Sequence, residues 1–325
     1  MAILITHHSA LEYWLNYRRK PMPTTLIRKI VAPCFSPPNS ETLEQTRGLG
    51  LIYPLDVMVK SPKEKRSQGY FRNHVIGKPL PEGSVFDTGN EVYVASPELC
   101  FIQLSNYLTV PQLLHLSMEL CGTYSLPLPD THVVEMLTDP KTLFDIPPLY
   151  TTTRLSSFID KAIGLQGQPN AAKALRYLAD GSASPMETIL YLLLTLPYKL
   201  GGYALPKPQL NPRINLPDAI RLSSKHEYYK CDLYWPDFKL AVEYDSDLHH
   251  TGPSRLASDS MRRKDLALLG IKVVTVTRQE VRYIEEFNKT ALLIAKLLGI
   301  RLRNNEAAGF TFAQAELRKV LLEKR

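Results

Sequence analysis

The order of elements expected between residues 184 and 300 constrains the fold of this chain more than any other feature of its sequence. Apolar and turn residues there predict a helix, three strands, a helix, a strand and a final helix. Strands and helices in this order form a mixed sheet between layers of helices. We therefore expect an α/β (α+β) fold in this region, with a mixed sheet flanked by helices.

Capping and turn residues set the limits of these elements. Ser184-Pro-Met-Glu187 predicts the start of the first helix, while Gly270 and Gly299 are stop signals after the other two helices. The expected elements are a helix from Ser184 to about Leu196, strands within Gln209–Leu216, Tyr228–Trp235 and Phe238–Asp245, a helix at Asp259–Leu269, a strand at Ile271–Thr277, and a helix from near Gln279 to near Leu298.

Residues 1–125 are expected to form a small α+β domain with an accessory or regulatory role. The pattern Ser9-Ala-Leu-Glu12 is typical of a capping box and predicts a short helix, whereas Pro21–Pro54 is expected to be mostly extended. Strands are predicted at Leu51–Val59, Tyr70–Ile76 and Val92–Val94, and helices from Ser96-Pro97 towards Tyr107 and at Val110–Leu120.

Three further segments complete the expected organisation. Residues 126–183 are interpreted as a proline-rich connection with helices at Leu155–Leu165 and Ala171–Ala179. Residues 184–300 form the domain with the mixed sheet, and residues 301–325 form a helical tail. A chain of 325 residues is long enough for two such domains, each with its own core.

Composition limits the class of protein. With 44% hydrophobic and 22% charged residues the chain is typical of soluble globular proteins, and its net charge of +7 fits a polyanionic partner. No apolar stretch is long enough to span a bilayer, and no secretory signal is recognisable at the start, so we expect a cytoplasmic protein without a membrane partner. The scattered cysteines argue against disulfides and a cysteine zinc site, and they fit a reducing cytosol; they are Cys34, Cys100, Cys121 and Cys231.

Carboxylates are concentrated in the hairpin expected at residues 230–245. Alternate residues of a strand face the same side, so Ala241, Glu243 and Asp245 share one face. If Trp235 pairs with Phe238 across a two-residue turn, Asp232 lies opposite Ala241 and diagonal to Glu243, with the two Cβ atoms roughly 7 Å apart. Such carboxylates would converge on one hard cation, and Mg²⁺ favours one or two of them together with water and phosphate oxygens. The alternative is an exposed acidic face paired with Lys239 or with nearby arginines.

Neighbouring residues extend this candidate site. His249 and His250 follow the acids in a loop, where a histidine could act as general acid or base, position a water or contact phosphate. Arg262, in the next expected helix, could contact the phosphate backbone. Exposed loop histidines and a solvated charged helix face are the structural alternatives. Glu187 is explained either as part of a capping box with Ser184 or as a third acid that reaches the metal site.

The ordered motifs resemble the PD-(D/E)XK, or restriction-endonuclease-like, nuclease superfamily. They are Ser184-Pro-Met-Glu187, Cys231-Asp232-Leu-Tyr-Trp-Pro, Leu240-Ala-Val-Glu243-Tyr-Asp245-Ser-x-x-His249, and Asp259-x-x-Arg262 followed by Leu269-Gly270-Ile-x-Val-Val-Thr-Val. They cover roughly residues 184–285 and are most similar to the branch related to very-short-patch-repair endonucleases. Carried over by position, the resemblance implies a site of Glu187, Asp232, Glu243, Asp245, His249, Asp259 and Arg262, with Asp232 and Glu243 as metal ligands.

The chain departs from the family pattern at three positions. Cys231 stands where the usual pattern has proline, Asp245 replaces the lysine of the superfamily name, and Ser246 replaces a glycine. The group that activates the water is therefore left open. The spacing from Glu243 favours His249 over His250 for the histidine position.

The resemblance implies a Mg²⁺-dependent endonuclease, with Mn²⁺ as an alternative ion, that hydrolyses phosphodiester bonds of DNA rather than RNA. The first half shows a fainter similarity to abortive-infection-type antitoxins, which indicates a setting in bacterial defence or a toxin–antitoxin system and transfers no functional residue. The motifs that carry it are Ser9-Ala-Leu-x-Tyr-Trp14, Val92-Tyr-Val-Ala-Ser-Pro-Glu98, Gln103-Leu-Ser and Leu113-Leu-x-Leu. Two alternatives stay open: a non-catalytic DNA-binding regulator on a nuclease scaffold, and a protein-interaction module whose partner covers the acidic face. The target sequence, the type of cleavage and the oligomeric state do not follow from the sequence.

Overall fold

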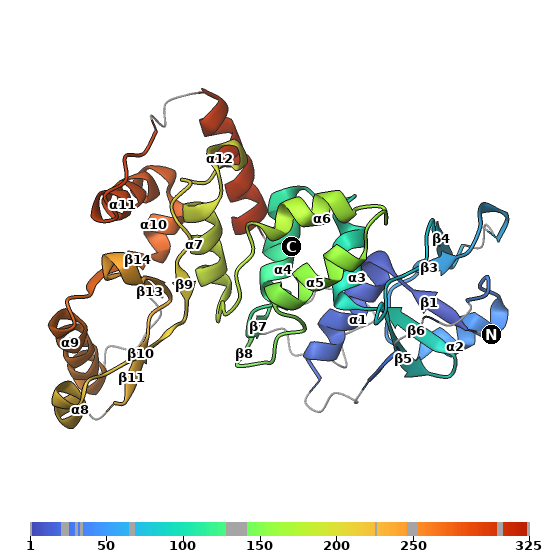
Figure 1. The fold of residues 1–325 in the computed structure, drawn as a ribbon, viewed down its shortest axis with the longest axis horizontal. Helices are drawn as coiled ribbons and strands as arrows, with labels where there is room; N and C mark the ends of the chain where they lie inside the picture. Colours follow the sequence, from blue (N-terminus) through green and yellow to red (C-terminus); the bar gives the residue numbers. More distant parts are fainter. Residues whose placement is uncertain are drawn as a thin grey trace. The chain divides into compact units, whose positions relative to one another are not determined.

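The computed structural model describes residues 2–20, 26–29, 32, 35–64, 69–127, 142–224, 226–245, 253–303 and 308–323. The chain divides into two compact units, Met1–Leu178 and Ala179–Lys324. Each unit contains helices and mixed sheets, which confirms the α/β (α+β) class (Figure 1).

The described part of the first unit contains a six-stranded sheet in the order β2-β5-β6-β1-β3-β4. Its central strand β1 pairs parallel with β6 and antiparallel with β3. The strands are β1 (Ile3–Ile5), β2 (Ile27–Lys29), β3 (Leu55–Val59), β4 (Phe71–Val75), β5 (Val85–Gly89) and β6 (Val92–Ala95), with a separate pair β7 (Tyr124–Ser125) and β8 (Leu143–Phe144).

Helix α1 (His7–Arg18) packs against β3, β6 and α3. Helix α3 in turn contacts α4, α5 and α6, so helices α5 and α6 belong to the first unit although the sequence suggested a connecting segment there. The other helices of this unit are α2 (Ser40–Arg47), α3 (Pro97–Leu104), α4 (Val110–Leu120), α5 (Thr152–Lys161), α6 (Gln168–Leu175) and the 3₁₀ helix η1 (Pro62–Glu64).

The second unit, as far as it is described, is built on a four-stranded sheet in the order β14-β13-β12-β9. Strands β13 and β14 are parallel, whereas β12 is antiparallel to both of its neighbours. A separate antiparallel pair is formed by β10 and β11. The strands are β9 (Gln209–Leu210), β10 (Arg213–Asn215), β11 (Tyr228–Lys230), β12 (Leu233–Trp235), β13 (Leu240–Asp245) and β14 (Lys272–Thr277).

Helices pack around this sheet. Helices α9 and α10 contact β14, and α12 packs on α7 and η2. The helices are α7 (Pro185–Thr195), α8 (Asp218–Ser224), α9 (Pro253–Leu268), α10 (Arg278–Arg282), α11 (Ile284–Leu297), α12 (Ala308–Leu322), and the 3₁₀ helices η2 (Tyr198–Leu200) and η3 (Pro236–Phe238).

Some helices begin at the capping residues predicted from the sequence, and others do not. Ser184 is the N-cap of α7, because its side chain accepts a hydrogen bond from the Glu187 N–H, and Ser96 caps α3 in the same way. The capping box expected at Ser9–Glu12 is wrong: α1 begins at His7 after the N-cap Thr6. The Ser9 hydroxyl is instead buried and accepts a hydrogen bond from the Asp56 N–H of β3.

Candidate functional site

The hairpin of β12 and β13 differs from the expected one in its register. Trp235 pairs with Leu240, not with Phe238, because η3 and Lys239 form a four-residue connection instead of a two-residue turn. The expected pairing of Asp232 with Ala241 is therefore wrong, since Ala241 pairs with Tyr234. The shift is by two residues, an even number, so it keeps every side chain on its expected face. Continued by one residue, the observed register sets Asp232 opposite Glu243.

Asp232 lies between β11 and β12 and is partly buried. Its Oδ2 accepts a hydrogen bond of 2.8 Å from the backbone N–H of Tyr244 on β13. Burial and the nearby carboxylate of Glu187 raise the pKa of Asp232 to about 7 from its ordinary 3.8; Glu243 acts in the same direction, while the Tyr244 N–H opposes the shift. Glu187 and Glu243, which belong to other segments, are thus close enough to Asp232 to disfavour its ionised form.

Glu187 was considered either as part of a helix cap or as a third acid of the site, and its position is compatible with both roles. Its backbone N–H is capped by Ser184, but its own carboxylate accepts a 2.8 Å hydrogen bond from the Ala183 N–H, and only 6% of the residue is exposed. Burial raises its pKa above 4.5, against the effect of that hydrogen bond and another from Asn211. The carboxylate therefore lies at the N-terminus of α7, beside Asp232, and is not pointing into solvent.

Asn211 connects Glu187 to Asp232, and sequence reasoning missed it. Its backbone N–H donates to the Asp232 carbonyl (3.0 Å), and its side-chain amide donates to Glu187 Oε2 (2.5 Å) and to the Gly181 carbonyl (3.0 Å). With φ of 48° it occupies the left-handed region, which asparagine tolerates better than most residues. The dipeptide Asn211-Pro212 is a turn signal in the sequence, but its local pattern does not indicate a partner on α7.

Glu243 and Arg262 form an ion pair between the sheet and α9. Arg262 Nη1 donates to Glu243 Oε2 (2.8 Å) and Nη2 donates to Oε1 (2.5 Å), the two-pronged geometry that suits a guanidinium. Arg262 Nη2 also donates to the Lys230 carbonyl (2.5 Å). The exposed fractions of the Arg262 and Glu243 side chains are 29% and 18%. Two predicted site residues, Arg262 and Glu243, are thus in contact, and each is the ion-pair partner of the other.

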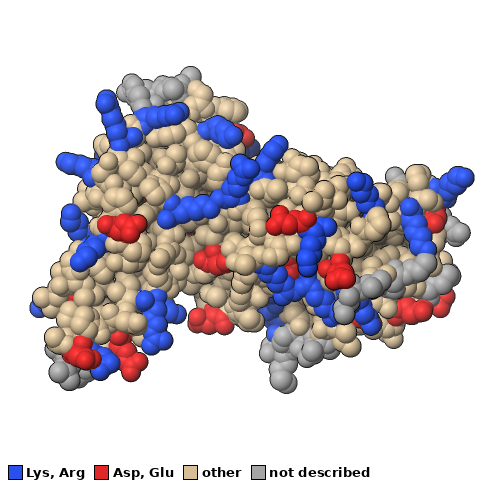
Figure 2. All heavy atoms as spheres, viewed as in Figure 1, with Lys and Arg blue, Asp and Glu red and all other residues tan. Residues whose placement is uncertain are grey.

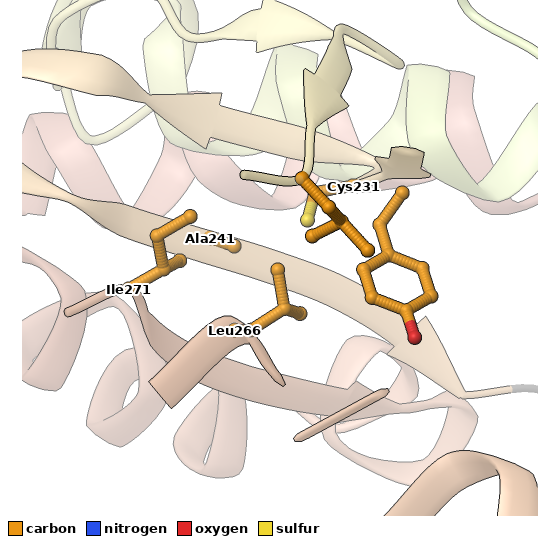
Figure 3. Close-up of a cluster of buried hydrophobic side chains, with 6 residues drawn as sticks. Cys231, Ala241, Leu266 and Ile271 are labelled. Carbon is orange, nitrogen blue, oxygen red and sulfur yellow. The ribbon is translucent and has the colours of Figure 1, made fainter. Parts of the chain in front are cut away.

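Beneath this ion pair, the face of β13 that carries Glu243 is covered by α9. Figure 3 shows Cys231, Ala241, Leu266 and Ile271 in one buried cluster. One turn of α9 after Arg262, the buried Asp265 accepts a 2.8 Å hydrogen bond from the Tyr229 hydroxyl. Asp232 and Glu243 therefore border a packed core and are partly buried, while the pairing of Glu243 with Arg262 agrees with the alternative of an acidic face paired with nearby arginines.

The other residues considered for the site are Asp245, His249, His250 and Asp259. Asp245 is exposed at the end of β13, two residues after Glu243 and therefore on the same face of the strand. His249 and His250 lie outside the described residues. Asp259 lies in α9, but its side chain is not among those described. Among the described residues, no three or more His, Cys, Asp and Glu side chains are grouped so that they could hold a metal ion as they stand.

Two general properties of the protein are the distribution of its surface charge and the length and polarity of its helices. On the face shown in Figure 2, Lys and Arg side chains are distributed over the surface with Asp and Glu side chains among them. The net positive charge thus does not mark out one binding surface on that face. In the described part of the chain, every helix is too short or too polar to cross a membrane.

Comparison with known proteins identifies distant relatives without an assigned activity. The chain is 33% identical over 129 residues to two uncharacterized proteins of Mycobacterium tuberculosis, from strains CDC 1551 / Oshkosh and ATCC 25618 / H37Rv. The match covers 39% of this chain and 42% of each relative, so it spans less than half of the length of either protein. No family model matches the chain. No solved structure matches it either.

Proposed function

We propose that the second unit is a metal-dependent endonuclease that hydrolyses phosphodiester bonds of DNA. The observation that carries the proposal is the convergence of Glu187, Asp232 and Glu243, which come from α7, from the segment before β12 and from β13. Glu187 and Glu243 raise the pKa of Asp232, a bound cation would relieve that repulsion, and perturbed acids cluster at functional sites. The choice of DNA and a setting in bacterial defence or a toxin–antitoxin system rest on the sequence resemblances.

The residues present fit a hard divalent cation in their chemistry. Asp232 and Glu243 would hold Mg²⁺ or Mn²⁺ through carboxylate oxygens, which are the ligands that Mg²⁺ prefers. The raised pKa of Asp232 is the property that a bound cation would reverse, because a positive charge favours the ionised carboxylate. Glu243 would have to give up or share its two hydrogen bonds with Arg262.

The surrounding side chains would perform defined tasks in such a site. A bound cation supplies Lewis acidity towards phosphate oxygen and lowers the pKa of a water. Arg262, once released from Glu243, would bind a phosphate oxygen through the same two N–H groups. Asn211 holds the Glu187 carboxylate and the Asp232 backbone, and therefore positions these two acids relative to each other.

Cleavage of a supercoiled plasmid by the full chain tests the proposal. Asp232→Asn removes the charge but keeps an oxygen that can accept from Tyr244, and Glu243→Gln is its counterpart on β13. The control is Asp237→Asn, which changes an exposed aspartate in the turn of the same hairpin. We expect cleavage in Mg²⁺ or Mn²⁺ by the wild type and by Asp237→Asn, and none by the two site variants. Equal cleavage by all four proteins would overturn the assignment of the site.

A DNA-binding regulator without catalysis is the second candidate. The observation that favours it is the ion pair of Arg262 with Glu243, which occupies both carboxylate oxygens of a proposed metal ligand. This function predicts salt-dependent DNA binding that is the same with Mg²⁺ and with EDTA. Binding of this kind, without cleavage in either metal, would replace the nuclease with the regulator.

A further inference from the structure

A cavity of about 280 Å³ lies in the first unit, within the region where α1, α3, β3 and β4 meet the segment after α5. Its walls are mixed, with the apolar side chains of Met58, Leu99 and Ile102 beside polar ones. Of the described residues that line it, Lys78 is a cation and none is an aspartate or glutamate. The exposed Lys78 makes no ion pair among the described residues. The cavity therefore favours a ligand that is neutral or negatively charged over a cation.

His7 lines this cavity in an unusual conformation. It is the first residue of α1, only 8% exposed, and its φ of 49° lies in the left-handed region, where a residue with a side chain is strained. Burial, with the neighbouring His74, lowers the pKa of His7 to about 3, so its imidazole is neutral at physiological pH. A neutral imidazole offers one donor and one acceptor nitrogen.

Neighbouring residues fix the His7 ring in this position. The Thr6 hydroxyl lies 2.7 Å from Nδ1, and the ring stacks on His74 with centroids 3.7 Å apart. His74 Nε2 is in turn 2.8 Å from Oδ1 of Asp56, which is 2% exposed. The second ring nitrogen of His7, Nε2, has no hydrogen-bond partner among the described residues. A strained and well-supported ring with one unused nitrogen at a cavity is the arrangement expected of a binding group.

Gln103 provides a second unused polar group in the same cavity. Its Oε1 accepts a 3.0 Å hydrogen bond from the His7 N–H, which leaves the amide nitrogen as a donor. No acceptor for that nitrogen is found among the residues that the structure describes, although Gln103 is only 6% exposed. Gln103 and Lys78 would therefore both donate hydrogen bonds to a ligand, and His7 would add a third polar contact.

We propose that the first unit binds a small organic anion, with an apolar body against Met58, Leu99 and Ile102 and a carboxylate or other acceptor group recognised by His7, Gln103 and Lys78. The site lies within the first unit and does not depend on the nuclease proposal. The volume restricts the ligand to a compact molecule, because cavities for drug-sized ligands begin at roughly 300 Å³. A monocyclic or branched-chain carboxylate fits these requirements.

Benzoate is a suitable probe, with benzamide as its neutral counterpart. The full chain labelled with ¹³C in its methionine methyl groups reports binding through Met58, whose resonance is assigned by Met58→Leu. We expect a saturable shift of the Met58 resonance with benzoate and binding of benzamide that is weaker by about three- to fivefold, the effect of one exposed charge. Lys78→Met, at an exposed position, should remove the difference between the two probes without affecting the fold.

His7→Asn is the decisive variant, because asparagine tolerates positive φ while the imidazole is lost. Its matched control is His8→Asn, at the exposed neighbouring histidine, which does not line the cavity. We expect His7→Asn to abolish the shift of Met58 and His8→Asn to leave it unchanged. Absence of a saturable shift in the wild type, or equal affinities for benzoate in Lys78→Met, His7→Asn and the wild type, would overturn the proposal.

Discussion

At the scale of single residues, Asp232 combines partial burial with two carboxylate neighbours. Its pKa of about 7 in the folded chain, against 3.8 ordinarily, means that the folded state binds the proton more tightly than the unfolded state. The stabilisation from this proton is fully present below pH 3.8 and is lost as the pH rises through 7. In the absence of a cation, the ionised Asp232 therefore opposes folding in neutral and alkaline solution.

We predict that Asp232→Asn stabilises the protein in EDTA. The variant should gain up to about 4 kcal/mol in free energy of unfolding at pH 8, and nearly nothing at pH 4, because asparagine has no charge to bury. Urea denaturation across this pH range measures the difference, with Asp237→Asn as the exposed control. A variant less stable than the wild type at pH 8 would contradict the burial of the charge. If the unit binds Mg²⁺ at this site, the ion should stabilise the wild type at pH 8 and not Asp232→Asn.

At the scale of elements, Asn211 joins three segments of the second unit: the loop at Gly181, the start of α7 and the backbone before β12. Its left-handed backbone and its side-chain hydrogen bonds contribute separately to this connection, and two substitutions separate them. Asn211→Gly keeps the backbone conformation accessible and removes the hydrogen bonds. Asn211→Ala removes the hydrogen bonds and adds the strain of a side chain at positive φ.

We predict that Asn211→Gly lowers the free energy of unfolding by about 1–2 kcal/mol and Asn211→Ala by about 2–4 kcal/mol. Urea denaturation at pH 7 measures both effects, and Asn215→Ala, at an exposed position of β10, should have little effect. Equal losses for glycine and alanine would show that Asn211 does not need its left-handed conformation.

The same unit shows how far local sequence patterns determine structure. Alternation in the β13 strand correctly placed Ala241 and Glu243 on one face, since a register shift by two residues leaves the faces unchanged. The connection itself was wrong because Lys239, at φ of 45°, adopts a conformation that a sequence pattern assigns to glycine or asparagine. The helix expected from near Gln279 to near Leu298 is also divided, because the extended backbone of Tyr283 separates α10 from α11.

The candidate site could be predicted in part. The spacing of Asp232 and Glu243 pointed to a convergence of acids, and the proximity of Glu187 and Glu243, which raises the pKa of Asp232, agrees with it. The bidentate pairing of Glu243 with Arg262 and the connection through Asn211 could not be derived from spacing. Both depend on which side chains the packing of α7 and α9 brings within hydrogen-bond distance, and no local pattern encodes that.

At the scale of the whole molecule, the chain consists of two compact units, and the two proposed sites lie in different units. Asp232 belongs to the second unit, while the cavity at His7 belongs to the first. Each unit contains its own buried apolar residues, so each is expected to unfold as a cooperative block.

We predict two transitions in differential scanning calorimetry of the full chain in EDTA at pH 8. Asp232→Asn should raise the midpoint of one transition and benzoate should raise the midpoint of the other, because a ligand or substitution stabilises the block that contains it. A single transition that shifts with both changes would show that the two units unfold together.

The ion pair of Arg262 with Glu243 has a thermodynamic consequence for the proposed nuclease. In that proposal each partner of the ion pair would have a competing ligand, a cation for Glu243 and a DNA phosphate for Arg262. The cation alone would leave the Arg262 guanidinium without a partner, and the phosphate alone would leave the Glu243 carboxylate without one. When both ligands bind, each of the two charges has a partner. Linkage then requires that each ligand increase the affinity for the other by the same factor. The protein would hold its cation weakly in free solution and tightly on DNA, so that the nucleic acid itself assembles the reactive site.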